Sequence, residues 1–181
     1  MKYTQIRDMD ISNGEGIGIA LFTQGCPYHC KNCFNPETWD FESGKDWNQE
    51  TENLIIELMK PDYIKRLTIL GGEPLIERNI EPLTSLLIRV KENYPNKKVW
   101  LYTGGNFEFE STRCDNLIKH TDIVVDGRYI DELKDYKLKF RGSSNQRLID
   151  IPKTLETGKV TLLNEYEYKE EKMFEKEPMF V

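Results

Sequence analysis

Apolar and polar residues occur along the chain in blocks that predict strands alternating with helices. Short apolar runs typical of buried strands lie at 17–22, 67–70, 99–102 and 123–125. Apolar residues at helical spacing between Ile80 and Val90 predict a helix with one buried face. Shorter helices are expected from the cap residue Asn48 to about Met59, and over 115–119. This alternation predicts βαβ units and a largely parallel sheet.

Glycine turns or polar loops follow all four predicted strands. The first strand runs into a cysteine-containing loop, and the other three end at Gly71-Gly72-Glu73-Pro74, Thr103-Gly104-Gly105 and Asp126-Gly127. Parallel α/β folds form their sites at the carboxyl ends of the strands. The sequence therefore predicts a site at one edge of the sheet.

The segments after the fourth strand give weaker signals. Residues 128–140 have no clear pattern, 141–147 resemble a polar turn, and beyond Pro152 the chain is charged without periodicity. A length of 181 residues fits a single domain. We expect that domain to cover 1–155 and a charged extension to cover 156–181.

The composition excludes several classes of function. Lys and Arg total 25 against 31 Asp and Glu, a net charge of −6, whereas a nucleic-acid binder held by phosphate contacts needs a basic surface. No stretch approaches the roughly 20 apolar residues that cross a bilayer. The first residues also lack the apolar segment of an export signal. We therefore expect a cytoplasmic protein that binds neither nucleic acid nor membrane.

Three of the four cysteines lie in one short segment. Cys26, Cys30 and Cys33 have the spacing C-x3-C-x2-C, and Cys114 lies far along the chain. In a reducing compartment, clustered cysteines more often hold a metal or do redox chemistry than form disulfides. Three thiolates suit three irons of a 4Fe–4S cluster and leave the fourth iron open to a ligand. The alternative is a structural zinc site with His29 or Cys114 as fourth ligand.

Together with Gly71-Gly72-Glu73-Pro74, this cysteine spacing resembles the radical S-adenosylmethionine enzymes. The resemblance implies an open, incomplete parallel β/α barrel, since the chain is too short for the closed barrel of about 250 residues. It also implies two cofactors, a 4Fe–4S cluster and S-adenosylmethionine bound to the open iron. An electron from the cluster would split S-adenosylmethionine into methionine and a 5′-deoxyadenosyl radical, so no side chain is expected to act as a catalyst.

Further motifs are similar to those of glycyl-radical-enzyme activases, in particular the activating proteins of anaerobic (class III) ribonucleotide reductases. They are Thr23-Gln24-Gly25-Cys26-Pro27, Cys33-Phe34-Asn35-Pro36-Glu37-Thr38-Trp39-Asp40-Phe41, Val125-Asp126-Gly127 and Arg141-Gly142-Ser143-Ser144-Asn145-Gln146-Arg147. The resemblance implies hydrogen abstraction from a glycine of the large reductase subunit, with a flavodoxin-like or ferredoxin-like reductant. Pyruvate formate-lyase activases and 7-carboxy-7-deazaguanine synthase-like enzymes are the alternatives within the superfamily. One departure is Gly18, where the family usually has Arg.

The resemblance also assigns residues to the binding of S-adenosylmethionine. They are Asn32, Cys33, Phe34, Gly71, Gly72, Glu73 and Thr103. Phe34 would support the adenine, and the two glycines would let the backbone come close to the methionine part. Free carbonyls or Glu73 would accept the ammonium protons of that part. For Gly71-Gly72-Glu73-Pro74 and for Thr103, near the ribose or carboxylate, an ordinary turn is the alternative. For Phe34 the alternative is packing.

Two charged features have both a binding and a structural interpretation. Arg141 and Arg147 either grip a carboxylate or the partner backbone, for which arginine is suited, or lie in a solvated loop. Asp126 either caps a turn or touches the cofactor. An incomplete barrel has an open side, and we expect the partner's glycine loop to enter there.

Overall fold

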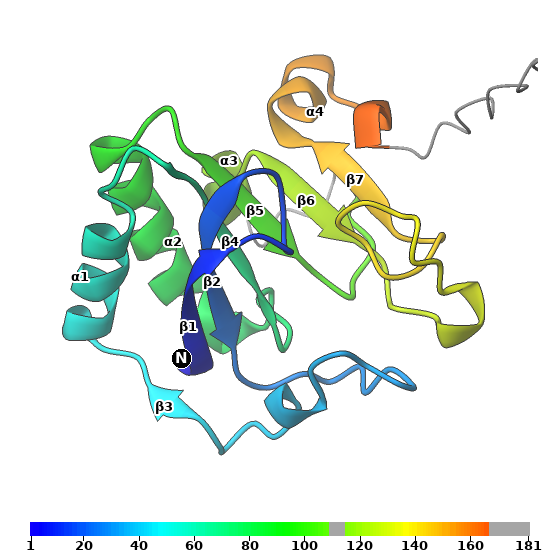
Figure 1. The fold of residues 1–181 in the computed structure, drawn as a ribbon, viewed down its shortest axis with the longest axis horizontal. Helices are drawn as coiled ribbons and strands as arrows, with labels where there is room; N and C mark the ends of the chain where they lie inside the picture. The colour runs from blue at the N-terminus through cyan, green and yellow to red at the C-terminus, as the bar shows by residue number, and fades with distance from the viewer. Residues whose placement is uncertain (109–114, 167–181) are drawn as a thin grey trace, which may run out of the picture.

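The protein is an α/β fold built on one seven-stranded sheet. The computed structural model describes residues 1–108 and 115–166 (Figure 1). The strand order is β3-β1-β2-β4-β5-β6-β7. The strands are β1 (Lys2–Asp10), β2 (Ile17–Thr23), β3 (Lys45–Asp46), β4 (Ile64–Gly71), β5 (Lys98–Tyr102), β6 (Ile123–Asp126) and β7 (Arg147–Asp150).

Four neighbouring strands form a parallel core. β2, β4, β5 and β6 pair in parallel, whereas β1, β3 and β7 add antiparallel edges. The sheet does not close, because β3 and β7 lie at its two ends. This confirms the prediction of an open α/β fold, consistent with a partial barrel.

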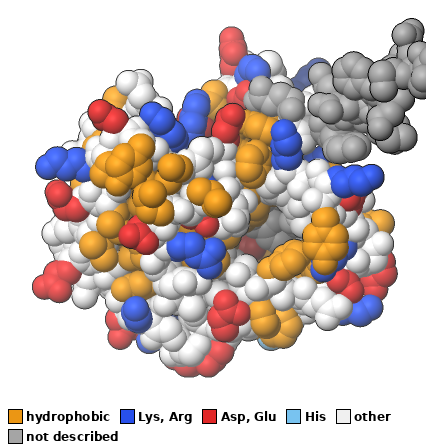
Figure 2. Space-filling model, viewed as in Figure 1, with side chains coloured by type: hydrophobic (Ala, Val, Ile, Leu, Met, Phe, Trp, Pro, Cys, Tyr) orange, Lys and Arg blue, Asp and Glu red, His pale blue; other side chains and the backbone are white. Residues whose placement is uncertain are grey.

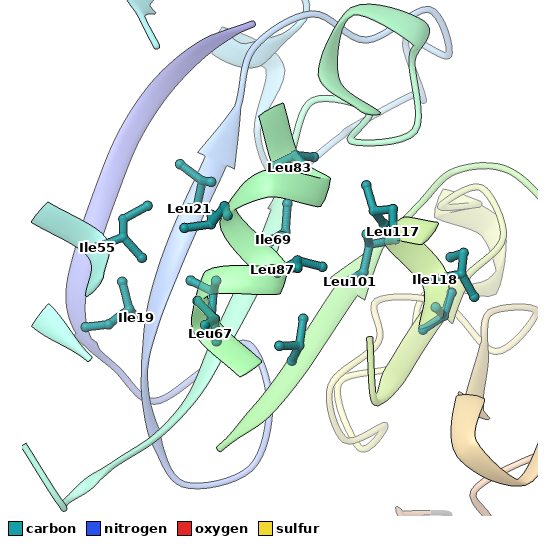
Figure 3. Packing of buried hydrophobic residues seen from close by; sticks show 14 of the residues in the cluster. Ile19, Leu21, Ile55, Leu67, Ile69, Leu83, Leu87, Leu101, Leu117 and Ile118 are labelled. Atoms are coloured by element: carbon teal, nitrogen blue, oxygen red, sulfur yellow. The ribbon is translucent and has the colours of Figure 1, made fainter. Parts of the chain in front are cut away.

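The helices cover one face of the sheet. They are α1 (Gln49–Leu58), α2 (Glu77–Asn93), α3 (Asp115–Lys119) and α4 (Ile151–Thr157). Leu83 and Leu87 of α2 lie over Leu67 and Ile69 of β4, and α3 continues this layer with Leu117 (Figure 3). All of these side chains are buried in one apolar cluster, which fixes the helices against the strands. None of the helices among the described residues is long and apolar enough to cross a bilayer.

The predicted elements are confirmed, with shifts at their ends. The four apolar runs form β2, β4, β5 and β6, and the three predicted helices form α1, α2 and α3. Asn48 caps α1 as expected, because its Oδ1 accepts a hydrogen bond of 2.9 Å from the backbone N–H of Thr51.

Four elements were missed by the sequence analysis. β1 and β3 lie at an edge of the sheet and are polar, so neither has an apolar run. The predicted polar turn 141–147 ends in β7, and the segment predicted to lose periodicity after Pro152 begins with α4. Both elements are too short, at four and seven residues, for a periodic pattern to be detected.

The described part of the C-terminal segment lies against the sheet. The predicted boundary after residue 155 falls inside α4, which ends at Thr157. Leu163 then donates its N–H to the carbonyl of Leu148 in β7, and the Tyr166 ring lies 6.0 Å from that of Trp100. The division into a domain and a charged extension stays a prediction.

The sheet face away from the helices contains a buried ion pair. Arg66 of β4 is fully buried and donates to the carboxylate of Asp10 at 2.8 Å and to Thr68 Oγ1 at 2.6 Å. A Cβ atom at Gly18 would meet the Arg66 side chain and lie 2.8 Å from its carbonyl oxygen. Arg66 therefore occupies the space that an arginine at position 18 would need. Although this chain has glycine where the family usually has arginine, a guanidinium group lies beside this position.

We expect Arg66→Ala to lower the free energy of unfolding by about 3–5 kcal/mol, because it leaves the Asp10 carboxylate buried and unpaired. The double variant Asp10→Ala/Arg66→Ala should lose less than the sum of the single variants. Arg7, whose side chain is 46% exposed and 3.6 Å from the same carboxylate, provides the control. Arg7→Ala should cost about 0–1 kcal/mol in a denaturant titration, and equal losses for Arg7 and Arg66 would contradict this account.

The same pair predicts a dependence of stability on pH. Burial alone would raise the pKa of Asp10, but hydrogen bonds from Arg66 and Asn13 outweigh it and hold the pKa below the ordinary 3.8. A carboxyl group with a lowered folded pKa stabilises the protein above its unfolded pKa. That contribution should therefore be complete above pH 3.8 and be lost as the pH falls through the folded pKa. The double variant should lack this part of the acid unfolding curve.

Candidate functional site

The loops after the four parallel strands meet at one edge of the sheet, as the sequence predicts. After β2 and β4, the N–H of Gly72 donates to Thr23 and that of Glu73 to Gly25, both at 2.8 Å. After β5 and β6, the N–H of Gly127 donates to the carbonyl of Gly105 at 3.0 Å. Backbone bonds of this kind hold neighbouring loops in a fixed arrangement, with the cysteine loop at one end.

The cysteine loop, residues 24–41, is closed on itself at its base. The N–H groups of Gly25 and Cys26 donate to the carbonyls of Thr38 and Trp39, at 2.8 and 3.1 Å. The Gln24 side chain donates to the carbonyls of Glu37 and Asp40. The segment Thr38-Trp39-Asp40-Phe41, noted in the sequence only as a motif, thus holds the start of the loop in place. Sequence inspection gave no such role to Gln24.

A side chain of helix α2 also supports the cysteine loop. Arg78, in the first turn of α2, donates to the carbonyls of Gln24 and Phe41 at 3.1 and 2.8 Å. Its guanidinium carbon lies 5.0 Å from the centre of the Phe41 ring. Arg78 was missed by the sequence analysis because it contacts residues more than 30 positions away.

The three clustered cysteines are half-buried and free. Burial raises the pKa of the Cys26 thiol, although the backbone N–H groups of Tyr28 and His29 donate to its sulfur and act in the opposite direction. The Asn35 N–H lies 3.4 Å from Cys33 Sγ. Three half-buried thiols, two of which receive backbone N–H groups, fit the thiolate ligands of an iron–sulfur cluster, whose sulfurs are stabilised in this way.

The arrangement fits a cluster better than a single zinc ion. Among the residues that the structure describes, no three His, Cys, Asp or Glu side chains form a group that could hold one metal ion. Thiolates that each bind a different iron need not converge on one point. The His29 ring stacks on Trp39, with centroids 4.7 Å apart, and Cys114 lies outside the described residues.

The two glycines after β4 allow their backbone to lie close to other segments of the protein. Gly71 has a φ of +102°, which other residues rarely adopt. A Cβ atom on Gly72 would lie only 2.5 Å from the carbonyl oxygen of Gly25, next to Cys26. Glycine at 72 is therefore required by the contact with the cysteine loop, whether or not a ligand also approaches it. Contact of Gly71 and Gly72 with S-adenosylmethionine stays a prediction.

Glu73 is buried and its carboxylate joins two loops. One oxygen accepts hydrogen bonds from Leu75 N–H and Thr103 Oγ1, at 2.9 and 2.8 Å, and the other accepts one from Gly104 N–H at 2.8 Å. Burial raises the pKa of Glu73, while these three donors act in the opposite direction. The carboxylate and the Thr103 hydroxyl thus have partners within the protein, although their contact with the cofactor stays a prediction.

The β5 turn also contacts the cysteine loop directly. A Cβ atom on Gly104 would lie 2.5 Å from the ring of Tyr28. Arg128, beyond β6, donates to the Tyr28 carbonyl at 2.7 Å and lies over its ring, 5.4 Å from the centroid. Tyr28 therefore links three of the four loops, a role that its place between two cysteines did not reveal.

Asn32 and Phe34 contact the loop between β6 and β7. Asn32 has a φ of +54°, and its amide donates to Asp131 at 2.7 Å. Phe34 is 60% exposed and lies 5.1 Å from Tyr129, measured between ring centres. The loop 127–146 thus forms a second wall beside the cysteines, and the adenosine contacts of Asn32 and Phe34 stay predictions.

The charged features near the end of β6 have internal partners. The fully buried Asp126 forms an ion pair with Arg147 and accepts the N–H of Phe107. Arg141 donates to the carbonyl of Gln146 at 3.1 Å, and the Gln146 amide donates to Gly127. Asp126 and Arg147 thus have a structural role as an ion pair, which differs from both the turn cap and the solvated loop considered from the sequence. Contact of these residues with a ligand or a partner stays a prediction.

Comparison with known proteins agrees with this site. A family model described as "4Fe-4S single cluster domain" matches residues 12–149. The chain is 36% identical over 148 residues to the anaerobic ribonucleoside-triphosphate reductase-activating protein of Enterobacteria phage T4, covering 82% of this chain and 93% of that protein. The proteins of the same name from Vibrio cholerae and Escherichia coli K12 are 38% and 34% identical, over 81% of this chain and 96% of each relative.

The open parallel sheet and the three-thiol loop define a 4Fe–4S protein of the radical S-adenosylmethionine class. The chain belongs to the family of anaerobic ribonucleoside-triphosphate reductase-activating proteins.

We expect Gly72→Val to disturb the cysteine loop, because its side chain would collide with the Gly25 carbonyl. The expected loss is about 1–3 kcal/mol of unfolding free energy, together with lower iron content after anaerobic reconstitution. Gly105→Ala is the milder comparison, since a Cβ there would lie 3.2 Å from the Tyr28 hydroxyl, a tight contact that a small movement of that side chain relieves. Normal iron loading in Gly72→Val would show that the two backbones separate without harm.

We expect Glu73→Gln to be destabilising, because an amide NH₂ group would replace one of the two oxygens and face an N–H donor. Loss of hydrogen bonds to a charged group costs about 1.5–3 kcal/mol, measurable by thermal or urea unfolding. Glu77→Gln, at an exposed position in α2, should change stability by no more than about 0.5 kcal/mol. Unchanged stability in Glu73→Gln would mean that the carboxylate does not join the two loops.

Proposed function

We propose that this chain is an oxidoreductase that activates an anaerobic ribonucleoside-triphosphate reductase by generating a glycyl radical on it. The observation that supports this most directly is the three-thiol loop, with backbone N–H groups at two of its sulfurs, at the carboxyl edge of an open parallel sheet. The family membership of the chain supports the choice of reductase as the partner, since its relatives are named for that activation.

The cluster and S-adenosylmethionine, when bound, supply the electron transfer and carbon–sulfur cleavage whose radical product removes a hydrogen atom from the glycine. The protein's part is to hold these groups and to exclude competing reactions. We assign Cys26, Cys30 and Cys33 to three irons, so that the fourth remains available to the methionine part of the cofactor.

The surrounding loops would fix the orientation of the cofactor. Because Glu73 ties the β4 turn to the β5 turn, the backbone of Gly71 and Gly72 is presented from a rigid edge. Phe34 offers an exposed aromatic face beside Cys33, suited to the adenine. Asn32, Glu73 and Thr103 would act mainly by holding this edge, since their side chains bond other residues.

The reductant and the compartment follow from the chemistry. A flavodoxin-like or ferredoxin-like protein is the electron donor we propose, because one electron at a low potential is needed. The cytoplasm is the compartment we propose, since its thiols stay reduced.

The test is anaerobic reconstitution with iron and sulfide, followed by reduction in the presence of S-adenosylmethionine and the large reductase subunit. We expect a glycyl signal in electron paramagnetic resonance that needs all three components. Cys26→Ser, Cys30→Ser and Cys33→Ser should each abolish the signal and lower iron content, because each removes an iron ligand.

Cys114→Ser is the matched control and should retain both iron and signal. Loss of the cluster in that variant would show that the ligand set is different. If the wild-type protein cleaves S-adenosylmethionine but forms a glycyl radical on pyruvate formate-lyase and not on the reductase, the proposal that the reductase is its partner is wrong.

A further inference from the structure

A fixed group of exposed aromatic side chains lies beside the cysteine loop. Phe34 packs against Tyr129, and the Lys134 ammonium lies 5.4 Å from the centre of the Phe34 ring and 4.6 Å from that of Tyr136. Phe34 is 60% and Tyr136 86% exposed. We call Tyr129, Lys134 and Tyr136, with Phe34 at the inner end, the aromatic patch.

The loop that bears the patch is bound tightly to the cysteine loop. Lys31 pairs with Glu132 at 2.8 Å, and the Asn32 amide donates to Asp131 at 2.7 Å. A Cβ atom on Gly142 would lie 2.9 Å from the Phe34 ring, so the two segments are in close contact. The patch therefore lies directly beside the cysteine loop.

The loop is also held from within. The side-chain oxygen of Gln146, Oε1, accepts hydrogen bonds from the N–H groups of Gly142 and Ser143. The side-chain amide of Asn145 donates to the backbone carbonyl of Arg128. The motif 141–147 thus serves to shape the loop. These hydrogen bonds hold a loop whose aromatic rings are exposed to water. Exposed aromatic side chains on an ordered loop are typical of a surface that another molecule covers.

The charge of the loop indicates the chemistry of that molecule. Residues 127–146 include five cationic side chains against three carboxylates, in a chain whose net charge is −6. Two of the three carboxylates, Asp131 and Glu132, already bond to the cysteine loop. Five cations against three carboxylates leave the loop with a net charge of +2, which favours a partner segment with apolar and acidic side chains.

The position of the patch indicates which partner it is. Phe34 directly follows Cys33, so a protein seated on the patch lies beside the cluster loop. Figure 2 shows hydrophobic and Lys or Arg side chains next to one another on the right of the molecule, where Figure 1 draws residues 127–146. A glycine of the partner that is to reach the cofactor must pass beside this loop.

We propose that the aromatic patch is the docking surface for the reductase segment that delivers the glycine, and that this segment presents apolar and acidic side chains to Tyr136 and Lys134. This inference rests on the proposed function. Phe34, at the inner end, also faces the adenine, whereas the outer residues Tyr136 and Lys134 act in partner binding only. The contribution of these two residues is therefore separable from the cleavage of S-adenosylmethionine.

The test compares Tyr136→Ser and Lys134→Glu with a matched pair, Tyr63→Ser and Lys60→Glu. Tyr63 is 53% exposed and, with Lys60, precedes β4 at the opposite edge of the sheet. Affinity of each reconstituted full-length protein for the cognate reductase would be measured by titration calorimetry. We expect the patch variants to bind about tenfold or more weakly, and the matched pair to bind like wild type.

Two further measurements separate the possible failures. Iron content and dithionite-driven cleavage of S-adenosylmethionine without reductase should be unchanged in all four variants, while the glycyl signal of the patch variants should recover at high reductase concentration. If wild type forms no glycyl radical, the proposed function fails. If wild type succeeds and the patch variants bind the reductase normally, or the matched pair is weakened equally, the docking proposal alone is wrong. Altered self-association of the patch variants with normal reductase affinity would likewise overturn it.

Discussion

The close contact between the Gly25 carbonyl and Gly72 determines where the cysteines can lie. Only a residue without a Cβ allows this approach, because that atom would come within 2.5 Å of the oxygen. The contact fixes the start of the cysteine loop against the turn after β4, and the bond from the Glu73 N–H to the same carbonyl strengthens it. The cluster ligands and the Gly-Gly-Glu-Pro turn, which are 38 to 45 positions apart when counted from each cysteine to Gly71, are therefore parts of one rigid unit.

Buried charge extends this unit across the sheet edge. The Glu73 carboxylate joins the turns after β4 and β5, and the Asp126–Arg147 pair anchors the start and the end of the loop 127–146. Each of these buried carboxyl groups has several hydrogen-bond donors or a paired guanidinium group, as burial requires. A site that must hold a cofactor for radical chemistry needs such positioning, since the reacting groups are supplied by the cofactors and the protein contributes orientation.

The incomplete sheet leaves one side of this unit open, and the two walls beside it differ in character. The cysteine loop provides thiols and half-buried backbone, whereas the loop 127–146 provides aromatic rings and positive charge. Short polar contacts between Lys31, Asn32 and the second loop bring the walls together. A protein substrate is accommodated more easily on such an open rim than within a closed barrel, which is consistent with an activase whose target is a large partner.

The sequence by itself determined the cluster chemistry, the four parallel strands and the edge at which their loops meet, because spacing and hydrophobic period are local properties. The tertiary structure decided what Glu73, Gly72 and Tyr28 contact. It also showed that Arg66 fills the space beside Gly18, and that the weakly patterned residues 127–146 form a wall of the site. These features depend on contacts between residues far apart in the chain, up to about one hundred positions for Asn32 and Asp131, and no local pattern records them.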